Sequence, residues 1–178
     1  VAKFGSGQTL KVAWGDCNGD GYPDLAVGNR GPTDHSGEQN YLYVNNGDGT
    51  FTQQAKFGSG ATYNISWVDF DGDGDLDAAV ANYGQNYLYV NNGSCSFTAQ
   101  AQFGNRHTLD IAWGDFDGDG DQDAAVANGR WPAEGDYSTN IQNELYVNNG
   151  DGTFSAHNEF GTRNSVSASW GDIDNDGD

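Results

Sequence analysis

Asp69-Phe70-Asp71-Gly72-Asp73-Gly74-Asp75-Leu76-Asp77 is a nine-residue acidic loop, and the short apolar run 78–81 follows it directly. Oxygen-bearing side chains occupy positions 1, 3, 5 and 9 of this loop. Glycine at position 6 permits the sharp turn that brings such side chains together, and the carbonyl of position 7 can add another oxygen. The same pattern occurs at 16–24 and 115–123 and begins again at 172–178. Four copies with one internal spacing indicate a repeated structural unit.

Other markers repeat around the loop. A Phe-Gly pair precedes each copy, and a Trp follows each of these Phe residues by ten positions. The Phe and Trp markers both advance by 53, 46 and 57 residues along the chain. Asn-Asn-Gly recurs at 45–47, 91–93 and 148–150. The chain is therefore an array of repeats, which has to be recognised before any fold is assigned.

Each repeat predicts four short strands. In the first repeat these are 9–16, 25–28, 41–44 and a strand that starts at 51. The second and third strands are apolar at successive positions, so both of their faces should be covered. Asp48-Gly49 and Asp151-Gly152 supply hairpin turns between the third and fourth strands. Four-stranded sheets that repeat in this way predict an all-β fold, a β-propeller.

We expect three complete blades and two partial ones. The blades are expected at 5–57, 58–103 and 104–160, with the end of a preceding blade at 1–4 and the start of a further blade at 161–178. Propellers typically have about 4–8 blades. The chain is therefore expected to be part of a longer protein, or to assemble with further copies that complete a ring.

The charge of the chain excludes several partners. The 178 residues include 26 acidic and 7 basic ones, which gives a formal net charge of -19. A nucleic-acid backbone and an anionic membrane surface both require Lys and Arg, so neither is expected as a partner. No apolar run approaches the ~20 residues of a membrane span, so no direct membrane insertion is expected. Aromatic residues make up 13% of the chain at regular positions, which argues against disorder.

The loops indicate a calcium site. Four oxygen side chains, a carbonyl and water supply about 6–8 oxygens, which is the coordination number of Ca²⁺. No His or Cys set accompanies them, and Mg²⁺ prefers fewer protein oxygens, so Zn²⁺ and Mg²⁺ are disfavoured. An EF-hand requires an acidic residue at position 12, where this chain has Val27, Val80 and Val126. Apolar position 2, such as Phe70, predicts an anchor beneath each loop.

Together, the Phe-Gly pairs, Trp-Gly-Asp and the acidic loop before Ala-Val resemble FG-GAP (VCBS-type) repeats. That family includes the calcium-binding propeller of integrin α subunits and certain propeller lectins. The resemblance implies Ca²⁺, mainly extracellular roles in adhesion and recognition, and in some members a propeller attached to an enzyme. The side-chain ligands it implies are Asp16, Asn18, Asp20, Asp24, Asp69, Asp71, Asp73, Asp77, Asp115, Asp117, Asp119 and Asp123. In the last repeat Asp172, Asp174 and Asp176 match, and the ninth position is missing. Position 7, which would offer its carbonyl, is Tyr22, Asp75 or Asp121.

Ligand binding should lie where the repeats differ. An insertion at 129–142 contains Trp131, Asp136 and Tyr137, and a smaller one at 30–39 contains His35. In an up-and-down blade these insertions lie on the face opposite the calcium loops. Variable loops on a rigid scaffold commonly carry binding residues. An exposed Trp beside acidic and amide groups can stack on a sugar ring or anchor a protein contact, so these four residues are the candidate ligand site.

The remaining Trp and Cys residues have structural interpretations. Trp14, Trp67, Trp113 and Trp170 share one repeat position and are expected in the core between blades. Cys17 and Cys95 are expected on the calcium face, in different blades. Either a disulfide or two separate thiols fits that placement.

We expect a binding protein and not an enzyme. The three His residues fall at unrelated repeat positions, and no nucleophile motif occurs. The expected function is a calcium-binding, secreted or cell-surface propeller for recognition or adhesion, with a glycan or an extracellular protein as its ligand. One alternative is a structural module that assembles into rings or filaments. Another is a non-catalytic or lyase-like propeller of a secreted polysaccharide-active enzyme.

Overall fold

The computed structural model describes residues 4, 7–32, 36–54, 57–99, 103–129, 141–161 and 163–171. In this part of the chain the regular structure is entirely β, without a helix and hence without a helix that could cross a membrane. The strands form three four-stranded sheets, each with consecutive strands as neighbours. Their bounds are β1 Thr9–Gly15, β2 Asp24–Asn29, β3 Tyr41–Asn45, β4 Phe51–Gln53, β5 Thr62–Val68, β6 Asp77–Asn82, β7 Tyr87–Asn91, β8 Phe97–Ala99, β9 Thr108–Gly114, β10 Asp123–Asn128, β11 Asn143–Asn148 and β12 Phe154–Phe160.

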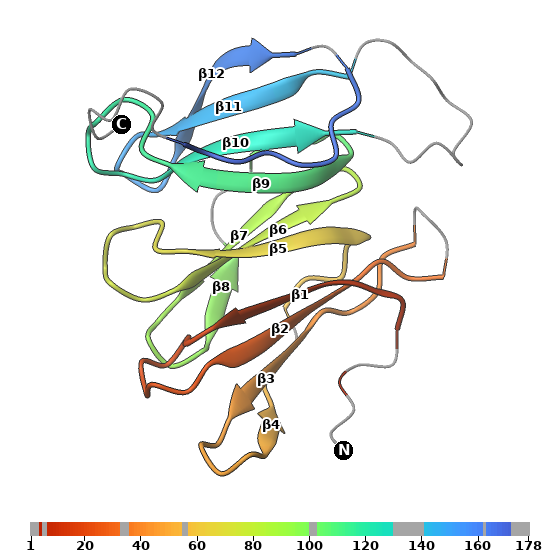
Figure 1. Ribbon diagram of the computed structural model, residues 1–178, viewed down its shortest axis with the longest axis vertical. Coiled ribbons are helices and arrows are strands. Elements are labelled where there is room, and N and C mark those ends of the chain that lie inside the picture. The colour runs from red at the N-terminus through yellow and green to blue at the C-terminus, as the bar shows by residue number, and fades with distance from the viewer. Residues whose placement is uncertain are drawn as a thin grey trace.

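The three sheets are the predicted blades, and every strand pair in them is antiparallel. They lie side by side along the long axis of the molecule, with β1, β5 and β9 facing one another near the middle (Figure 1). The three sheets do not close into a ring. The expectation of an all-β architecture built from four-stranded blades is confirmed.

The second strand of each blade is its most buried element. Every residue of β2, β6 and β10 is buried, because each of these strands has neighbours on both edges and packed side chains on both faces. The fourth strands of the first two blades, β4 and β8, have three residues each. These strands lie at the outer edge of their sheets, where no further strand pairs with them.

The hydrophobic core lies between blades. One cluster joins the first and second blades through side chains such as Leu42 and Ile65. Another joins the second and third blades through side chains such as Leu88 and Ile111. Aliphatic side chains from two facing sheets interdigitate there, as in other stacked-sheet cores. Each blade therefore depends on its neighbour for the burial of one face.

The expectation that the four Trp residues lie in the core between blades is confirmed for Trp67 and Trp113 but not for Trp14 and Trp170, whose rings are exposed. Trp67 lies over Gly15 of the first blade, where a Cβ would come within 2.7 Å of the indole. Trp113 donates its indole N–H to Ser66 Oγ at 3.0 Å across the next boundary. Trp14 is instead 56% exposed. Its face of the first blade has no neighbouring sheet among the described residues, and its aromatic contact is with Phe51 of its own blade, 6.1 Å away between ring centroids.

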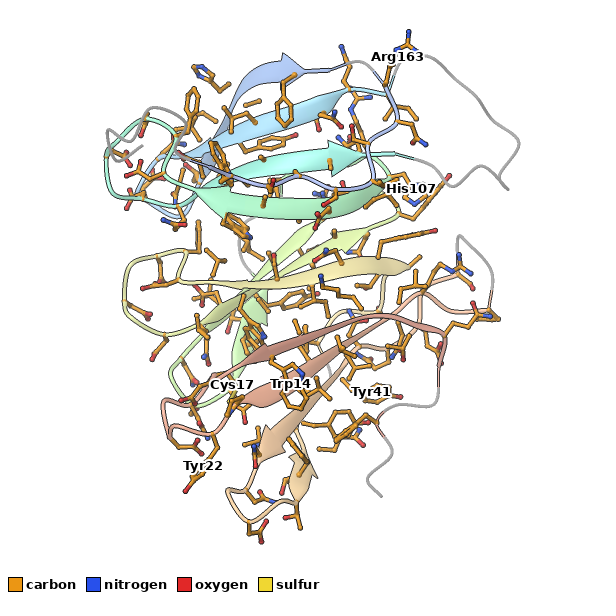
Figure 2. The ribbon with its side chains drawn as sticks, viewed as in Figure 1. Trp14, Cys17, Tyr22, Tyr41, His107 and Arg163 are labelled. Carbon is orange, nitrogen blue, oxygen red and sulfur yellow. A yellow bond between two sulfur atoms is a disulfide. The ribbon has the colours of Figure 1, made fainter. Side chains whose placement is uncertain are left out.

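The two ends of the blades carry different loops, as strand direction predicted. The acidic loops β1–β2, β5–β6 and β9–β10 all lie at the left in Figure 1. The connections that leave β2, β6 and β10 start at the opposite end. Figure 2 shows the same separation, with Cys17 and Tyr22 at the loop end and His107 and Arg163 at the other. We call these ends the loop face and the insertion face.

Candidate metal centre

Each of the three described acidic loops turns sharply at two glycines. Positions 4 and 6 both have positive φ, for example 72° at Gly72 and 92° at Gly74 in the second loop. An L-residue with a side chain is strained in this region, whereas glycine adopts it without steric cost. No other atom lies within 4 Å of a Cβ built at either position, so the requirement is conformational and not one of space. The Asp-Gly-Asp-Gly sequence therefore folds the loop back on itself.

The carboxylate at position 1 closes the loop. Asp16 accepts hydrogen bonds from the backbone N–H groups of Asp20 at 3.1 Å and Gly21 at 2.8 Å. In the third loop, Asp115 accepts equivalent bonds from Asp119 at 3.1 Å and Gly120 at 2.9 Å. These bonds hold the later half of the loop over the first aspartate, so the side chains of positions 1 and 3 face the same side.

The carboxylate at position 9 joins the loop to the rest of its blade. Asp77 is fully buried, and its two oxygens accept hydrogen bonds from different segments. Oδ2 accepts the Phe70 N–H of the loop at 3.0 Å, and Oδ1 accepts the Asn91 N–H at the end of β7 at 2.7 Å. Asp24 and Asp123 make the same pair of contacts in their blades. Position 9 is thus a structural anchor as well as a candidate ligand.

The fold brings positions 1, 3 and 9 together in two loops. Carboxylate oxygens of Asp69, Asp71 and Asp77 all lie within 4.8 Å of one another. Asp115, Asp117 and Asp123 form the equivalent group in the third loop. Because their side chains converge on one point, each triad can supply oxygen ligands to a single cation.

Burial and nearby negative charges raise the pKa values of several carboxyls at positions 3 and 9 of the loops. The pKa of Asp77 is raised from 3.8 to about 6, chiefly by burial, although the N–H groups of Asn91 and Phe70 partly oppose the shift. Burial also raises the pKa of Asp24 and Asp123. The pKa of Asp71 is raised by burial and then by the negative charge of Asp73. A cation among these groups would favour the ionised carboxylates and so oppose each shift.

One buried oxygen tests whether the residues suit a cation. Asp69 Oδ1 is shielded from solvent and has no hydrogen-bond partner among the residues that the structure describes, whereas Oδ2 accepts the Gly74 N–H at 3.0 Å. A buried carboxylate oxygen without a partner is costly. A cation bound beside Asp69 would give this oxygen its partner. The donor set is also oxygen only, so the second loop suits a hard cation such as Ca²⁺.

The comparison with protein families decides what these loops belong to. A family model described as FG-GAP-like repeat matches residues 16–79 and 69–126, which together span more than half of the chain. The chain belongs to the FG-GAP repeat family. A comparison with curated proteins finds no match. Each matched segment starts at position 1 of an acidic loop, so the loops described above are the FG-GAP loops of this chain.

The remaining predicted ligands of the FG-GAP loops have other contacts. At position 5, Asp73 and Asp119 stand outside the two triads, and each accepts the N–H of position 7 at 2.9 Å. At position 7, the Tyr22 ring lies beside Gly47, so only its carbonyl is a candidate ligand. The predicted Asp172, Asp174 and Asp176 lie outside the described residues.

The first FG-GAP loop differs from the others because it contains a disulfide. Cys17 at position 2 is bonded to Cys95 in the β7–β8 turn, with 5.2 Å between their Cα atoms. The two sulfurs lie close to Asp24, but as a disulfide they offer no thiolate to a metal. Asp16, Asn18, Asp20 and Asp24 therefore remain the candidate ligands of this loop. Of the two arrangements that the sequence left open for the cysteines, the structure has the disulfide.

Position 2 is a buried anchor in two of the three described loops. Cys17 and Phe70 are 1% and 3% exposed, as predicted. Phe70 stacks on Phe154 of the third blade, with ring centroids 5.3 Å apart. For Phe116 the prediction is wrong, because this ring is 37% exposed. It lies on the side of the third blade that no other sheet among the described residues covers, and its ring contacts are with His157 and Trp170.

The candidate ligand residues of the insertions cannot be placed. His35, Trp131, Asp136 and Tyr137 lie outside the described residues. Beside the first insertion, a cavity of about 520 Å³ opens between the first two blades, lined by Gln39, residues 58–60, Tyr87 and Tyr89. At the next blade boundary, Arg106 and Glu144 occupy the positions equivalent to Gly60 and Tyr87 and form an ion pair at 3.2 Å.

A buried polar chain near the insertion face was missed in the sequence. The same links repeat along the chain. In each blade a Thr hydroxyl bonds to the Asn that ends the second strand of that blade. The Asn at or just before the start of the third strand bonds to the equivalent hydroxyl of the following repeat. Thr62 Oγ1, for example, accepts from Asn40 Nδ2 and donates to Asn82 Oδ1, both at 2.9 Å. The members are Thr9, Asn29, Asn40, Thr62, Asn82, Asn86, Thr108, Asn128, Asn143 and Ser165. Their recurrence at fixed repeat positions was the available signal.

Proposed function

We propose that this FG-GAP protein binds Ca²⁺ in its acidic loops and uses the stabilised blades for extracellular recognition. The observation that carries the calcium assignment is the convergence of Asp69, Asp71 and Asp77, with the buried Asp69 Oδ1 lacking any other partner. Bound Ca²⁺ would neutralise carboxylates that otherwise repel one another. The side chains of positions 1, 3 and 9 would hold it, while the position 9 carboxylate keeps the loop attached to its blade.

Calcium titration with a matched pair of variants tests the metal assignment. We expect Ca²⁺, and Mg²⁺ much less, to raise the melting temperature of the metal-free protein. Asp69→Ala should remove one site from the calorimetric stoichiometry. Asp151→Asn, an exposed turn aspartate on the same face, should leave it unchanged. Equal binding by wild type and Asp69→Ala would refute the assignment.

An extracellular location is part of the proposal. Weak calcium sites fill at the millimolar Ca²⁺ of extracellular fluids. The buried disulfide between Cys17 and Cys95 also fits an oxidising compartment, since disulfides are rare in the cytosol. Detection of the natural protein in the culture medium or at the cell surface would support this location, and detection only in the cytosol would contradict it.

The proposed activity is binding, with a glycan as the favoured ligand. The cavity between the first two blades combines the aromatic rings of Tyr87 and Tyr89 with the amide of Gln39. Flat aromatic faces and neutral hydrogen-bonding groups suit a sugar ring. Its volume lies within the range of small-molecule sites. It also opens beside the 30–39 insertion, on the face where the sequence predicted a ligand.

A glycan array in Ca²⁺ tests this activity. Tyr87→Ala should weaken binding, and so should Trp131→Ala if the larger insertion also contacts the sugar. Tyr22→Ala serves as the control, because Tyr22 is an exposed aromatic residue on the opposite face. Absence of selective glycan binding by the folded protein would favour an extracellular protein as the ligand.

Self-assembly is a second candidate function, favoured by an exposed apolar face. Leu10, Val12 and Trp14 of β1 are 43%, 50% and 56% exposed. In the next blade, Ile65 and Trp67 occupy the positions of Val12 and Trp14 and pack against the preceding blade. A further sheet could cover β1 in the same way. Sedimentation at increasing concentration should then reveal oligomers, and Trp14→Ser should reduce them.

A further inference from the structure

The disulfide occupies the site where the first FG-GAP loop meets the second blade. Both cysteines are buried, and the 78 residues of sequence that separate them reach from the first loop to the β7–β8 turn. A hydrogen bond from Asn91 Nδ2 to the Cys17 carbonyl, at 2.6 Å, crosses the same boundary. Since Cys17 lies between Asp16 and Asn18, the covalent link is within the candidate calcium loop itself.

The sulfurs also contact the anchor carboxylate of that loop. Asp24 Oδ2 lies 3.1 Å from Cys17 Sγ and 3.6 Å from Cys95 Sγ, and it accepts the Cys17 N–H at 3.0 Å. Its other oxygen accepts the Asn45 N–H at 2.8 Å. Any separation of the two sulfurs therefore acts directly on Asp24, which is both a candidate ligand and the attachment of the loop to its blade.

The second loop shows the same junction without a covalent bond. There Phe70 replaces Cys17, stacks on Phe154 and accepts a hydrogen bond from Asn148 at 3.0 Å. Gly152 occupies the position of Cys95 and has the left-handed φ, 84°, that glycine adopts freely. Cys95 has a φ of 57° at this position, which is strained for a residue with a side chain. The disulfide thus holds Cys95 in a conformation that its own backbone disfavours.

We propose that the Cys17–Cys95 disulfide controls the calcium affinity of the first FG-GAP loop, so that reduction weakens this site and leaves the second and third loops unchanged. The inference rests on the proposed calcium function. Reduction by a dithiol adds two electrons and two protons to the disulfide, gives two thiols, and converts the dithiol to its own disulfide. Two non-bonded thiols need more room than the bonded pair, and Asp24 borders that space.

Two physical effects then lower the affinity. The first loop gains conformational freedom once its tie to the second blade is cut, and binding has to remove that freedom. Asp24 also loses its fixed position relative to Asp16 and Asn18. We expect about a tenfold loss of affinity, within the usual range for coupled sites. By the reciprocity of linked equilibria, Ca²⁺ should make the disulfide harder to reduce by the same factor.

Calorimetric Ca²⁺ titration of the full chain, oxidised and after reduction by dithiothreitol, tests the proposal. Reduction should weaken one site, and thiol titration should verify that the bond is open. Asp20→Ala, an exposed substitution in the first loop, should remove this site, so that reduction no longer changes the Ca²⁺ binding of the protein. The dithiothreitol concentration needed for half-reduction should rise in Ca²⁺. An equal loss at all sites, or none, would overturn the inference.

A second variant covers the case in which the reduced protein unfolds. Cys17→Phe with Cys95→Gly copies the residues that the second loop uses at its own junction. It should fold, insensitive to dithiothreitol, and its first loop should bind Ca²⁺ more weakly than the oxidised wild type. Equal affinity would overturn the inference, because the disulfide would then join the two blades without affecting Ca²⁺ binding. If the oxidised wild type bound no Ca²⁺, the proposed function itself would fail, so the two failures are distinguishable.

Discussion

At the scale of single residues, Asp77 has two roles in the second blade. One is to face Asp69 and Asp71 as a candidate ligand, and the other is to accept the N–H groups of Phe70 and Asn91. The second role does not require a metal. The ninth position of the loop therefore holds the loop to its blade without needing a bound cation, unlike the exposed aspartates at positions 3 and 5.

Asp77→Asn should destabilise the metal-free protein, whereas Asp73→Asn should not. In the variant an NH₂ group replaces one of the two Asp77 oxygens, which accept the N–H groups of Phe70 and Asn91 in the wild type. One of these buried N–H donors is then left without an acceptor. Such a loss costs about 1–3 kcal/mol. Asp73 is exposed and supplies the control. Urea unfolding in EDTA measures both variants, and equal midpoints would contradict the anchoring role.

The raised pKa of Asp77 predicts a pH dependence that calcium reverses. Its pKa in the folded chain is about 6, above its ordinary 3.8, so folding favours the protonated acid. The stabilisation is complete below about pH 4 and is lost as the pH rises through about 6. Metal-free protein should therefore unfold at lower urea at pH 7 than at pH 5, chiefly through this group. In Ca²⁺ the order should invert, because binding requires the carboxylate.

At the scale of the blades, the buried Asn and Thr chain determines how neighbouring sheets align. Asn40 and Asn82 belong to different blades and both bond to the hydroxyl of Thr62. A polar group at each boundary can find its partner in only one register, whereas aliphatic side chains tolerate small shifts. The apolar clusters hold adjacent blades together, and the polar chain specifies their relative position.

Thr62→Val should be clearly destabilising, and Thr9→Val should have little effect. The first substitution leaves two buried amides without their hydroxyl partner, at a cost of about 2–4 kcal/mol when each unmet group costs about 1–2 kcal/mol. Thr9 has the same repeat position but is exposed and bonds only to Asn29 in its own blade. Urea midpoints in Ca²⁺ compare them. Similar losses would indicate a general preference for Thr at strand starts.

For the molecule as a whole, stability arises at the boundaries between blades. Each core cluster draws its side chains from two sheets, and β1, β5 and β9 stack on one another. Trp67 and Trp113 therefore pack across a boundary between blades, whereas the equivalent ring of Trp14 has no sheet beside it among the described residues. Repeat proteins generally distribute their stability between units and interfaces in this way.

Trp67→Ala should destabilise the protein far more than Trp14→Ala. Trp67 packs over Gly15 and within the first core cluster, so its removal leaves a cavity worth about 3–5 kcal/mol. Trp14 has the same position in its repeat but is more than half exposed. Thermal melting in Ca²⁺ measures the difference. Comparable losses would show that Trp14 is covered in solution, which would support self-assembly.

The sequence by itself determined the repeat, the blades and the acidic loops, since these depend on local features that recur. Asp-Gly-Asp-Gly can be recognised wherever it stands, because the left-handed turn and the converging oxygens are encoded within nine residues. Strand direction likewise placed loops and insertions on opposite faces. Only the tertiary structure decided that Cys17 and Cys95 are joined, that Asp77 also holds Asn91, and that Phe116 and Trp14 are exposed. Each of these depends on which residues of another segment or blade lie within contact distance, and sequence spacing does not contain that information.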